Sequence, residues 1–265
     1  MLWGRKYSGM RTKILYEDRD ILVIHKPAGL ATHTSKVGQM DVVSELKNYL
    51  AAENRRRGAA GEPPFLGVVH RLDQPVEGLL VFGKTRRATA KLTEQLKSGA
   101  LNKHYFAVIC GKPEEEKGRV VDYLVKGEDN MAKVVPEGTP GAKRAILDFE
   151  RLDVRQMELG VWQEVASVGR PVCVSLARVH IRTGRYHQIR VQMAHLGHSL
   201  LGDQKYGSAA ARKLGESLNV SNVALCAYHL AFEHPFTGKK LEYTVCPENR
   251  AFLLFQNFFA ENDPY

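Results

Sequence analysis

Four consecutive residues, His70 to Asp73, place an imidazole, a guanidinium and a carboxylate shortly before an apolar run. The run from Gly78 to Lys84, GLLVFGK, is typical of a buried strand, so we expect the cluster at the mouth of that strand. An aspartate beside cations stays ionised at neutral pH, which suits a nucleophile. Taken alone, the same four residues could equally form an ion-pair cluster on the surface.

A second polar cluster follows the end of another expected strand. The segment RTGRYHQIR, residues 182–190, leaves this strand, turns at Thr183 and Gly184, and enters a helix. Four hydrogen-bonding side chains lie within its last six residues: Arg185, His187, Gln188 and Arg190. A helix N-terminus favours anions, and an ordinary helix does not require this concentration of polar groups there. The segment is therefore a candidate for binding or catalysis.

Short strands and helices must position the two clusters. Apolar alternation and short apolar runs predict strands at residues 14–16, 21–25, 78–84, 105–110, 172–181, 225–232 and 241–245. Apolar residues at helical spacing predict helices at residues 42–50, 88–96, 185–196 and 248–259, with Asp41 as a cap for the first. Because strands outnumber helices and occur in runs, we expect an α+β fold with a largely antiparallel sheet.

The segment AAENRRRGAAGEPP, residues 51–64, has no apolar periodicity, and we expect it to form a surface loop. Its three arginines, Arg55 to Arg57, form the most basic run of the chain. Such a run is either a solvated surface or a contact for phosphates, and the sequence does not decide between the two. Residues 1–9 are expected to be a flexible extension, and residues 10–265 a single catalytic domain.

The overall charge favours a polyanionic partner. The 265 residues include 38 Lys and Arg against 29 Asp and Glu, which gives a net charge of +9. Neutralising phosphates with such an excess releases condensed counterions. The four cysteines are scattered without a CxxC pair, which disfavours a disulfide framework or zinc ribbon. Without an apolar leader or membrane-length run, we expect a cytoplasmic protein that is not bound to a membrane.

Four segments, in the same order, resemble motifs of the RluA-type pseudouridine synthases. VHRLDQPVEGLL is similar to the family's HRLDxxTSGLL, and RTGRYHQIRVQMAHLGHSLLGDQKYG to TGRxHQIRVHxAHLGHPIxGDxxYG. Residues 103–111 resemble the strand KxYxAxVxG, and ILVIHKPAG resembles the opening strand and turn. The resemblance implies the pseudouridine synthase fold, a bent mixed sheet flanked by helices and loops. It also implies isomerisation of specific uridines in structured ribosomal or transfer RNA.

The resemblance assigns roles to individual residues. Asp73 would be the nucleophile that permits cleavage of the N1–C1′ bond of a uridine, whose base then reattaches through C5. Tyr105 would pack against this base, and Arg190 would pair with Asp73. Arg71 would help to displace the base from its stack and hold the vacated space. The expected substrate-binding residues are His70, Arg71, Leu72, Arg185, His187 and Gln188. Isomerisation neither gains nor loses atoms, so we expect no cofactor and no metal.

The sequence also departs from the family motifs. Val76 and Glu77 replace the usual Thr-Ser, which adds a negative charge near Asp73, while Gln192 replaces a common His and Ser199 a common Pro. These changes bear on the contacts with the substrate more than on the reaction. We expect no accessory RNA-binding domain before the catalytic one, so RNA affinity would come from the basic surface of a monomer.

Two other functions are compatible with parts of the sequence. A catalytically silent RNA-binding protein with this fold would be expected to lack Asp73, Tyr105 or Arg190, and all three are present. A metal enzyme is suggested by four histidines in one region, His180, His187, His195 and His198. Neither an HExxH motif nor a paired carboxylate–histidine pattern accompanies them, so a metal site is disfavoured.

Overall fold

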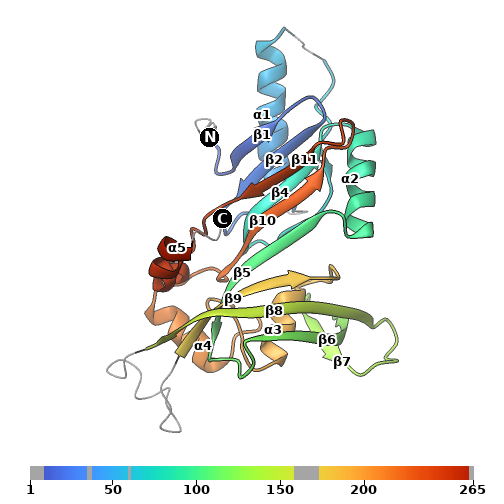
Figure 1. The fold of residues 1–265 in the computed structure, drawn as a ribbon. Helices are drawn as coiled ribbons and strands as arrows, with labels where there is room; N and C mark the ends of the chain where they lie inside the picture. Colours follow the sequence, from blue (N-terminus) through green and yellow to red (C-terminus); the bar gives the residue numbers. More distant parts are fainter. Residues whose placement is uncertain (1–8, 35–37, 59–60, 158–172, 263–265) are drawn as a thin grey trace. The chain divides into compact units, whose positions relative to one another are not determined.

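The chain forms two compact units (Figure 1). Unit 1 comprises residues 1–103 and 227–246, and unit 2 comprises residues 104–226 and 247–265. The computed structural model describes four stretches of the chain: residues 9–34, 38–58, 61–157 and 173–262. No helix within these stretches is both long and apolar enough to cross a bilayer.

The domain organisation expected from the sequence stays a prediction. Apart from Gly9, the expected extension over residues 1–9 lies outside the described residues. The single catalytic domain expected over residues 10–265 is not tested by the description of two separate units. Each unit is therefore treated by itself.

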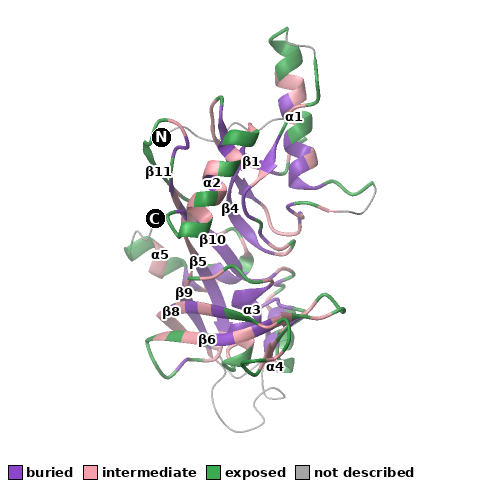
Figure 2. Ribbon diagram, turned by 90° about the vertical axis from the view of Figure 1, so that its right-hand side faces the viewer, coloured by how far each residue is buried: buried purple, intermediate pink, exposed green. Residues whose placement is uncertain are grey.

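Unit 1 is built on a sheet in which β1, β2, β4, β10 and β11 lie side by side, with β3 along β4. The strands are β1 (Lys13–Glu17), β2 (Ile21–Lys26), β3 (Gly67–Val68), β4 (Glu77–Gly83), β10 (Leu225–Glu233) and β11 (Lys240–Thr244). Every residue of β2 and β4 is buried, and Figure 2 shows β4 in purple. Their antiparallel register pairs Lys26 with Gly78, so the end of β2 lies beside the start of β4.

Two helices complete unit 1. Helix α2 (Arg86–Ser98) is capped by Thr85, whose hydroxyl accepts from the Ala88 amide, and is followed by Gly99, which has the left-handed conformation. Its buried residues Ala88 and Leu92 belong to the same apolar cluster as side chains of β2 and β4. Helix α1 (Val42–Arg56) is capped by Asp41, as expected.

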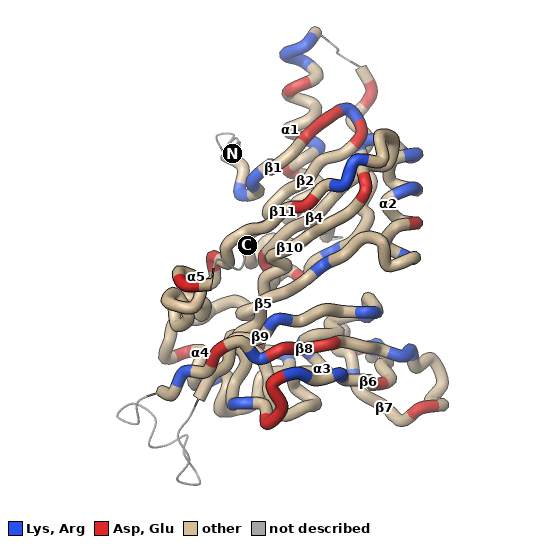
Figure 3. The backbone as a smooth tube through the Cα atoms, viewed as in Figure 1, with Lys and Arg blue, Asp and Glu red and all other residues tan. Residues whose placement is uncertain are grey.

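The expected loop over residues 51–64 is wrong in its first part, because α1 continues to Arg56. Apolar periodicity ends at Leu50, but Ala, Glu and Arg favour helix without an apolar face. Glu53 pairs with Arg56 at 2.8 Å and with Arg57 at 3.9 Å, which supports the last turn. Figure 3 shows the basic end of α1 that results.

Gly78, at the start of β4, is required by close packing. Its φ is +129°, and a Cβ built there would lie 2.5 Å from backbone atoms of Ala227 in β10. Only glycine allows the backbone to approach its neighbour this closely. The short connection after Asp73 thus leads straight into a tightly packed strand.

Unit 2 is also built on an antiparallel sheet, in the order β5-β9-β8-β6-β7. Its strands are β5 (Asn102–Cys110), β6 (Lys117–Lys126), β7 (Ala132–Val135), β8 (Lys143–Gln156) and β9 (Cys173–Ile181). The sequence predicted β5 and β9 but missed the strands between them. Charged residues line β8, as Figure 3 shows, and Asp148 pairs there with Arg119 and Arg182. Such cross-strand ion pairs hide the apolar alternation of a strand.

The helices of unit 2 are α3 (Gln188–His195), α4 (Ala209–Ser217), the 3-10 helix η2 (Arg250–Phe255) and α5 (Gln256–Asn262). Helix α3 begins three residues later than expected, because His187 has a left-handed φ of +53° and ends the preceding turn. The expected helix over residues 248–259 is divided into η2 and α5, and α4 was missed. The predicted α+β class with a largely antiparallel sheet is nevertheless confirmed.

Candidate active site

The segment His70–Asp73 forms the loop between β3 and β4 in unit 1. Arg71 is exposed, Leu72 is buried and Asp73 is half-buried. The backbone turns directly after the aspartate, where the Val76 amide donates to the Asp73 carbonyl at 3.0 Å. The expectation that this cluster lies at the mouth of a buried strand is confirmed, since β4 is buried throughout.

The turn that follows β2 runs beside this loop and holds it on both sides of Asp73. On one side, the Thr32 hydroxyl donates to the Leu72 carbonyl at 2.8 Å and accepts from the Leu72 amide at 3.2 Å. On the other side, the Gly29 amide donates to the Gln74 carbonyl at 2.8 Å. The Gln74 side-chain amide donates back to the Gly29 carbonyl at 3.3 Å. The backbone position of Asp73 is therefore fixed through both of its neighbours.

Lys26, the last residue of β2, provides a third attachment that the sequence analysis missed. Its side chain is fully buried, and its ammonium donates to three backbone carbonyls. These belong to Pro27 at 2.9 Å, Leu30 at 2.6 Å and Gln74 at 3.2 Å. A lysine is almost never fully buried unless its charge is matched. The position of Lys26 at the end of an apolar run was therefore the sequence feature that could have indicated its role.

Two carboxylates balance the charge of Lys26. Burial lowers the pKa of Lys26 from 10.5 to about 7, whereas Asp73 and Glu77 act to raise it and Arg11 adds to the lowering. Glu77 is only 1% exposed. The ammonium of Lys26 therefore offsets the negative charge that Glu77 brings to this region, and it attracts both carboxylates electrostatically.

His70 lies inside unit 1, where it ties the loop to β4. Its Nε2 accepts from the Val81 amide at 3.4 Å, so the proton of the neutral ring lies on Nδ1. Burial, with a smaller effect of the positive charge of Lys103, holds the pKa of His70 well below its ordinary value. The imidazole is therefore neutral at pH 7. The expected contact of His70 with substrate stays a prediction, as do those of Arg71 and Leu72.

The second predicted cluster lies in unit 2, where α3 carries Arg190. Its guanidinium forms a bidentate ion pair with Asp203, with Nε 2.7 Å from Oδ2 and Nη2 2.7 Å from Oδ1. Their side chains are 4% and 0% exposed. Burial acts to raise the pKa of Asp203, but the hydrogen bonds and charge of Arg190 outweigh it and lower the pKa.

Asp203 was not predicted as the partner of Arg190, although it lies in the motif GDQKYG. The same motif supplies Tyr206, whose ring lies 5.1 Å from the Arg190 guanidinium carbon. The expected pairing of Arg190 with Asp73 joins residues of different units and stays a prediction. Tyr105 lies on β5 in unit 2, is 4% exposed, and faces Val179 on β9.

The remaining predicted residues shape the turn before α3. The Gln188 side-chain oxygen accepts from the Thr183 hydroxyl at 2.8 Å and the Arg185 amide at 3.0 Å. The exposed Arg185 donates through Nε to a carbonyl of β8 at 2.9 Å. His187 Nδ1 lies 2.7 Å from the Tyr206 hydroxyl. These contacts fix the turn, and the substrate-binding roles expected for Arg185, His187 and Gln188 stay predictions.

The histidines that suggested a metal site contact separate partners. His195 Nδ1 lies 3.2 Å from the Asp122 carboxylate, and His198 Nδ1 lies 3.1 Å from a carbonyl of β5. The ring centroid of His180 is 4.6 Å from that of His104 on the neighbouring strand. Each ring is thus placed by a different protein group.

Three other side chains with metal-ligand atoms, Asp18, Asp20 and His234, lie within 4.8 Å of one another in unit 1. His234 Nδ1 accepts from the amides of Phe236 and Thr237, at 3.3 and 3.1 Å. Its Nε2 lies 2.9 Å from the Asp18 carboxylate. Both ring nitrogens are therefore engaged by protein groups, and the cluster is accounted for as a structural hydrogen-bond network.

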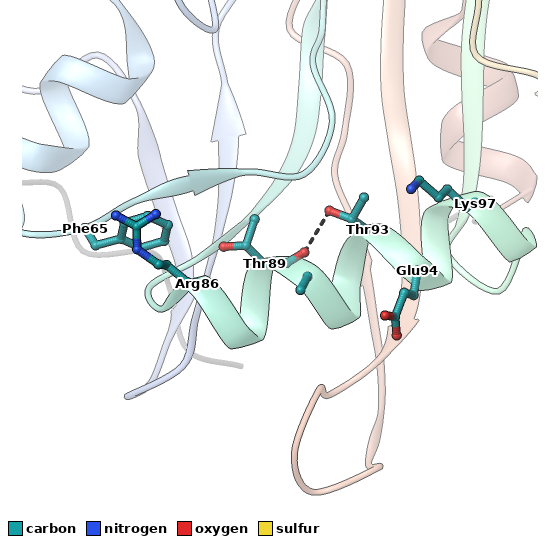
Figure 4. Close-up of a pocket in the computed structure, with 7 residues that line it drawn as sticks. Phe65, Arg86, Thr89, Thr93, Glu94 and Lys97 are labelled. Carbon is teal, nitrogen blue, oxygen red and sulfur yellow. Dashed lines mark hydrogen bonds between the residues drawn. The ribbon is translucent and has the colours of Figure 1, made fainter.

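A shallow hollow of about 460 Å³ lies along α2 (Figure 4). Arg86 lies over the Phe65 ring at 5.3 Å, and the Thr93 hydroxyl donates to the Thr89 carbonyl at 2.7 Å. Lys97 completes this row on the helix. None of the residues predicted for the active site lines the hollow.

The sequence matches the family model of the RNA pseudouridylate synthases over residues 20–195. It is 32% identical over 254 residues to a ribosomal large subunit pseudouridine synthase D of Zymomonas mobilis, covering 94% of this chain and 74% of that protein. It is 34% identical over 226 residues to an uncharacterized RNA pseudouridine synthase, YhcT, of Bacillus subtilis, covering 85% of this chain and 65% of that protein.

Solved structures agree in fold. Human RNA Pseudouridylate Synthase Domain Containing 1 matches with a TM-score of 0.65 at 21% identity, over 92% of this chain and 86% of that one. Human RNA Pseudouridylate Synthase Domain Containing 4 matches with the same TM-score at 24% identity, over 92% and 91% of the two chains. At this level of identity the likeness establishes the fold.

Proposed function

Because the chain belongs to the RNA pseudouridylate synthase family, we propose that it isomerises specific uridines of structured ribosomal or transfer RNA, with Asp73 as the nucleophile. The family assigns the enzyme class and the RNA substrate. The choice of RNA and the roles of individual residues are our proposal.

The observation that carries the role of Asp73 is its double attachment. Bonds to the backbone of Leu72 and Gln74 hold the residue on both sides, while the residue itself remains half-buried rather than enclosed. A nucleophile requires this combination of a fixed position and an accessible carboxylate. The ammonium of Lys26 adds a positive charge that interacts with this carboxylate.

The reaction exchanges one bond for another within the uridine. The N1–C1′ bond breaks with the help of the Asp73 carboxylate, the base turns, and C5 forms the new bond to C1′. The proton on C5 is lost and N1 gains one, so the product has the same atoms as the substrate and the carboxylate is regenerated. In this proposal Tyr105 packs against the base and assists removal of the C5 proton.

Arg190 is proposed to pair with Asp73 while it remains bound to Asp203. Asp203 accepts from Nε and Nη2 of the guanidinium. A guanidinium has five N–H donors, which suffice for a second carboxylate. With its orientation set by the buried Asp203, Arg190 would keep the nucleophile charged and aimed at the sugar. Arg71, which is exposed, would occupy the space that the flipped base leaves.

The direct test is Asp73→Asn, which removes the nucleophilic charge but keeps the shape of the side chain. We expect no detectable pseudouridine in substrate RNA, with RNA affinity within about threefold of wild type, since phosphate contacts dominate such affinity. Asp129→Asn, at an exposed turn between β6 and β7, is the matched control and should be fully active. Conversion of uridine by Asp73→Asn would show that the nucleophile is assigned wrongly.

The RNA target is found by mapping pseudouridine across total RNA from cells with and without the gene. A site lost only in the deletion strain, and restored by wild-type protein but not by Asp73→Asn, identifies the substrate. Loss of a site in an RNA that is neither ribosomal nor transfer RNA would contradict the proposed substrate class.

A further inference from the structure

The backbone of Leu72, the residue before Asp73, is bound at both polar groups by one side chain. The hydroxyl of Thr32 donates to its carbonyl at 2.8 Å and accepts from its amide at 3.2 Å. The Thr32 side chain is buried, with the residue only 3% exposed. Two bonds to one residue restrain the rotation as well as the position of its backbone, and so restrain the direction in which the chain enters Asp73.

Thr32 is itself fixed by the start of α1. Its carbonyl accepts from the Val43 amide at 3.2 Å, and the preceding carbonyl, that of Ala31, accepts from the Val42 amide at 3.0 Å. The helix cap Asp41 accepts from the Thr34 amide at 2.7 Å. A β-branched side chain also has few rotamers available. Thr32 therefore links a rigid helix end to the loop that carries the carboxylate.

We propose that Thr32 is a positioning residue for Asp73, which sets the carboxylate for attack and contributes to the rate rather than to RNA binding. The proposal rests on the proposed role of Asp73 as nucleophile. A buried hydroxyl whose donor and acceptor both serve Leu72 is not placed to contact RNA. Small errors in the placement of a reacting group cost large factors in rate, whereas RNA affinity depends on many separated contacts.

The test is Thr32→Val, which keeps the volume and branching of the side chain and removes both bonds to Leu72. In steady-state conversion of a substrate RNA, we expect kcat to fall at least about tenfold. KM and the Kd for the RNA should stay within about twofold of wild type. Thr32→Ser, which keeps the hydroxyl, should recover most of the lost rate. If Thr32 only stabilised the fold, kcat would not fall while KM and Kd stayed unchanged.

Thr12→Val is the matched control for lost stability. Thr12 is buried in the same unit, with 1% exposed, and its hydroxyl bonds to Glu45 of α1 instead of the Asp73 loop. We expect this variant to unfold at a lower temperature than wild type while its kcat is unchanged. A fall in kcat equal to that of Thr32→Val would assign the effect to general loosening of the unit and overturn the proposal.

Two further outcomes separate the proposal for Thr32 from the proposed function of the protein. If Asp73→Asn is inactive but Thr32→Val has a kcat within twofold of wild type, Thr32 has no positioning role and the nucleophile assignment stands. If Asp73→Asn is active, the proposed function itself fails. Should Thr32→Val not fold, hydrogen exchange of the wild-type backbone amides still tests whether Thr32 holds the backbone of Leu72. The Leu72 amide must then exchange as slowly as the amides of β4, and fast exchange would overturn the proposal.

Discussion

The two units hold their buried charges in different ways. In unit 2, cations and anions meet directly: Arg190 forms a bidentate pair with Asp203. In unit 1, the ammonium of Lys26 donates to backbone carbonyls, and the carboxylates of Asp73 and Glu77 act on it as nearby charges. The first arrangement fixes one guanidinium in one protonation state, whereas the second leaves an ammonium that titrates near neutral pH.

This difference suits the roles proposed for the two clusters. Arg190 would have to be a permanent cation of fixed orientation, and a buried carboxylate with two matched oxygens provides both properties. The loop around Asp73 instead needs a fixed backbone. Bonds from Thr32, Gly29 and Lys26 to the backbone of Leu72 and Gln74 provide it.

The largest effect is expected from breaking the buried pair of unit 2. Asp203→Asn keeps the shape of the side chain but leaves the guanidinium of Arg190 buried without its countercharge. The free energy of unfolding should fall by about 3–5 kcal/mol, measured by urea denaturation. Asp148→Asn is the control in the same unit, since Asp148 shares its charge with two arginines that are 50% and 61% exposed. It should lose at most about 1 kcal/mol, and equal losses for both variants would contradict the comparison.

An intermediate effect is expected for Lys26, and it depends on pH. The pKa of Lys26 is about 7 in the folded protein, against 10.5 for an ordinary lysine. Between these values the unfolded chain binds a proton that the folded protein lacks, so stability rises as pH rises from 7 towards 10.5 and is lost again as pH falls from 10.5 to 7. Wild type should gain about 2 kcal/mol relative to Lys26→Met between pH 7 and 9, measured by urea denaturation.

Lys103, with a pKa lowered to about 8 by burial, adds a similar slope of its own. Because it is present in both proteins, it cancels in the difference between wild type and Lys26→Met. A difference that does not change between pH 7 and 9 would show that Lys26 keeps its charge throughout this range. The buried charges of unit 1 would then resemble the permanent pair of unit 2.

Much of the fold could be predicted because apolar periodicity marks its buried elements. Most residues of strands β2 and β4 are apolar, and Asp41 is a standard helix cap, so these features were found. Strand β8 and the last turn of α1 were missed because solvent-facing charges, paired with neighbours in space, replace the apolar signal there. The pair of Asp148 with Arg119 in particular joins residues 29 apart, which a local pattern does not contain.

The candidate site was predictable at the level of segments but not of contacts. The motifs placed Asp73 and Arg190 in polar clusters, and the structure locates Asp73 in the loop before β4 and Arg190 in the first turn of α3. The supports of these residues, Lys26, Thr32 and Asp203, were missed. Lys26 and Thr32 lie 48 and 40 residues from the backbone groups that they bind, and nothing in a single sequence specifies which distant polar side chains will meet. Only a folded backbone determines that.

The smallest effect concerns the exposed cations of the two units. Arg55 and Arg57 lie at the basic end of α1 in unit 1, where Arg57 reaches Glu53 only at 3.9 Å. In unit 2, Arg119 and Arg182 bind Asp148 at 2.6 and 2.8 Å. Arginines held by a carboxylate at hydrogen-bond distance gain less from a phosphate, because that contact must first be given up. We therefore expect Arg55 and Arg57 to contact RNA phosphates and the closely paired Arg119 and Arg182 to contribute little.

Replacing Arg55 and Arg57 together by glutamine should weaken RNA binding about three- to tenfold near 100 mM salt. It should also reduce the slope of log K against log salt by about two, one for each lost phosphate contact. Replacing Arg119 and Arg182 by glutamine removes the same charge and is the matched control, with an expected change in slope below about one. Both are measured by fluorescence anisotropy in the Asp73→Asn background, so that turnover does not interfere. Equal slopes for the two double variants would show that Arg55 and Arg57 make no specific phosphate contacts. These arginines would then form a solvated surface that contributes only through its overall positive charge.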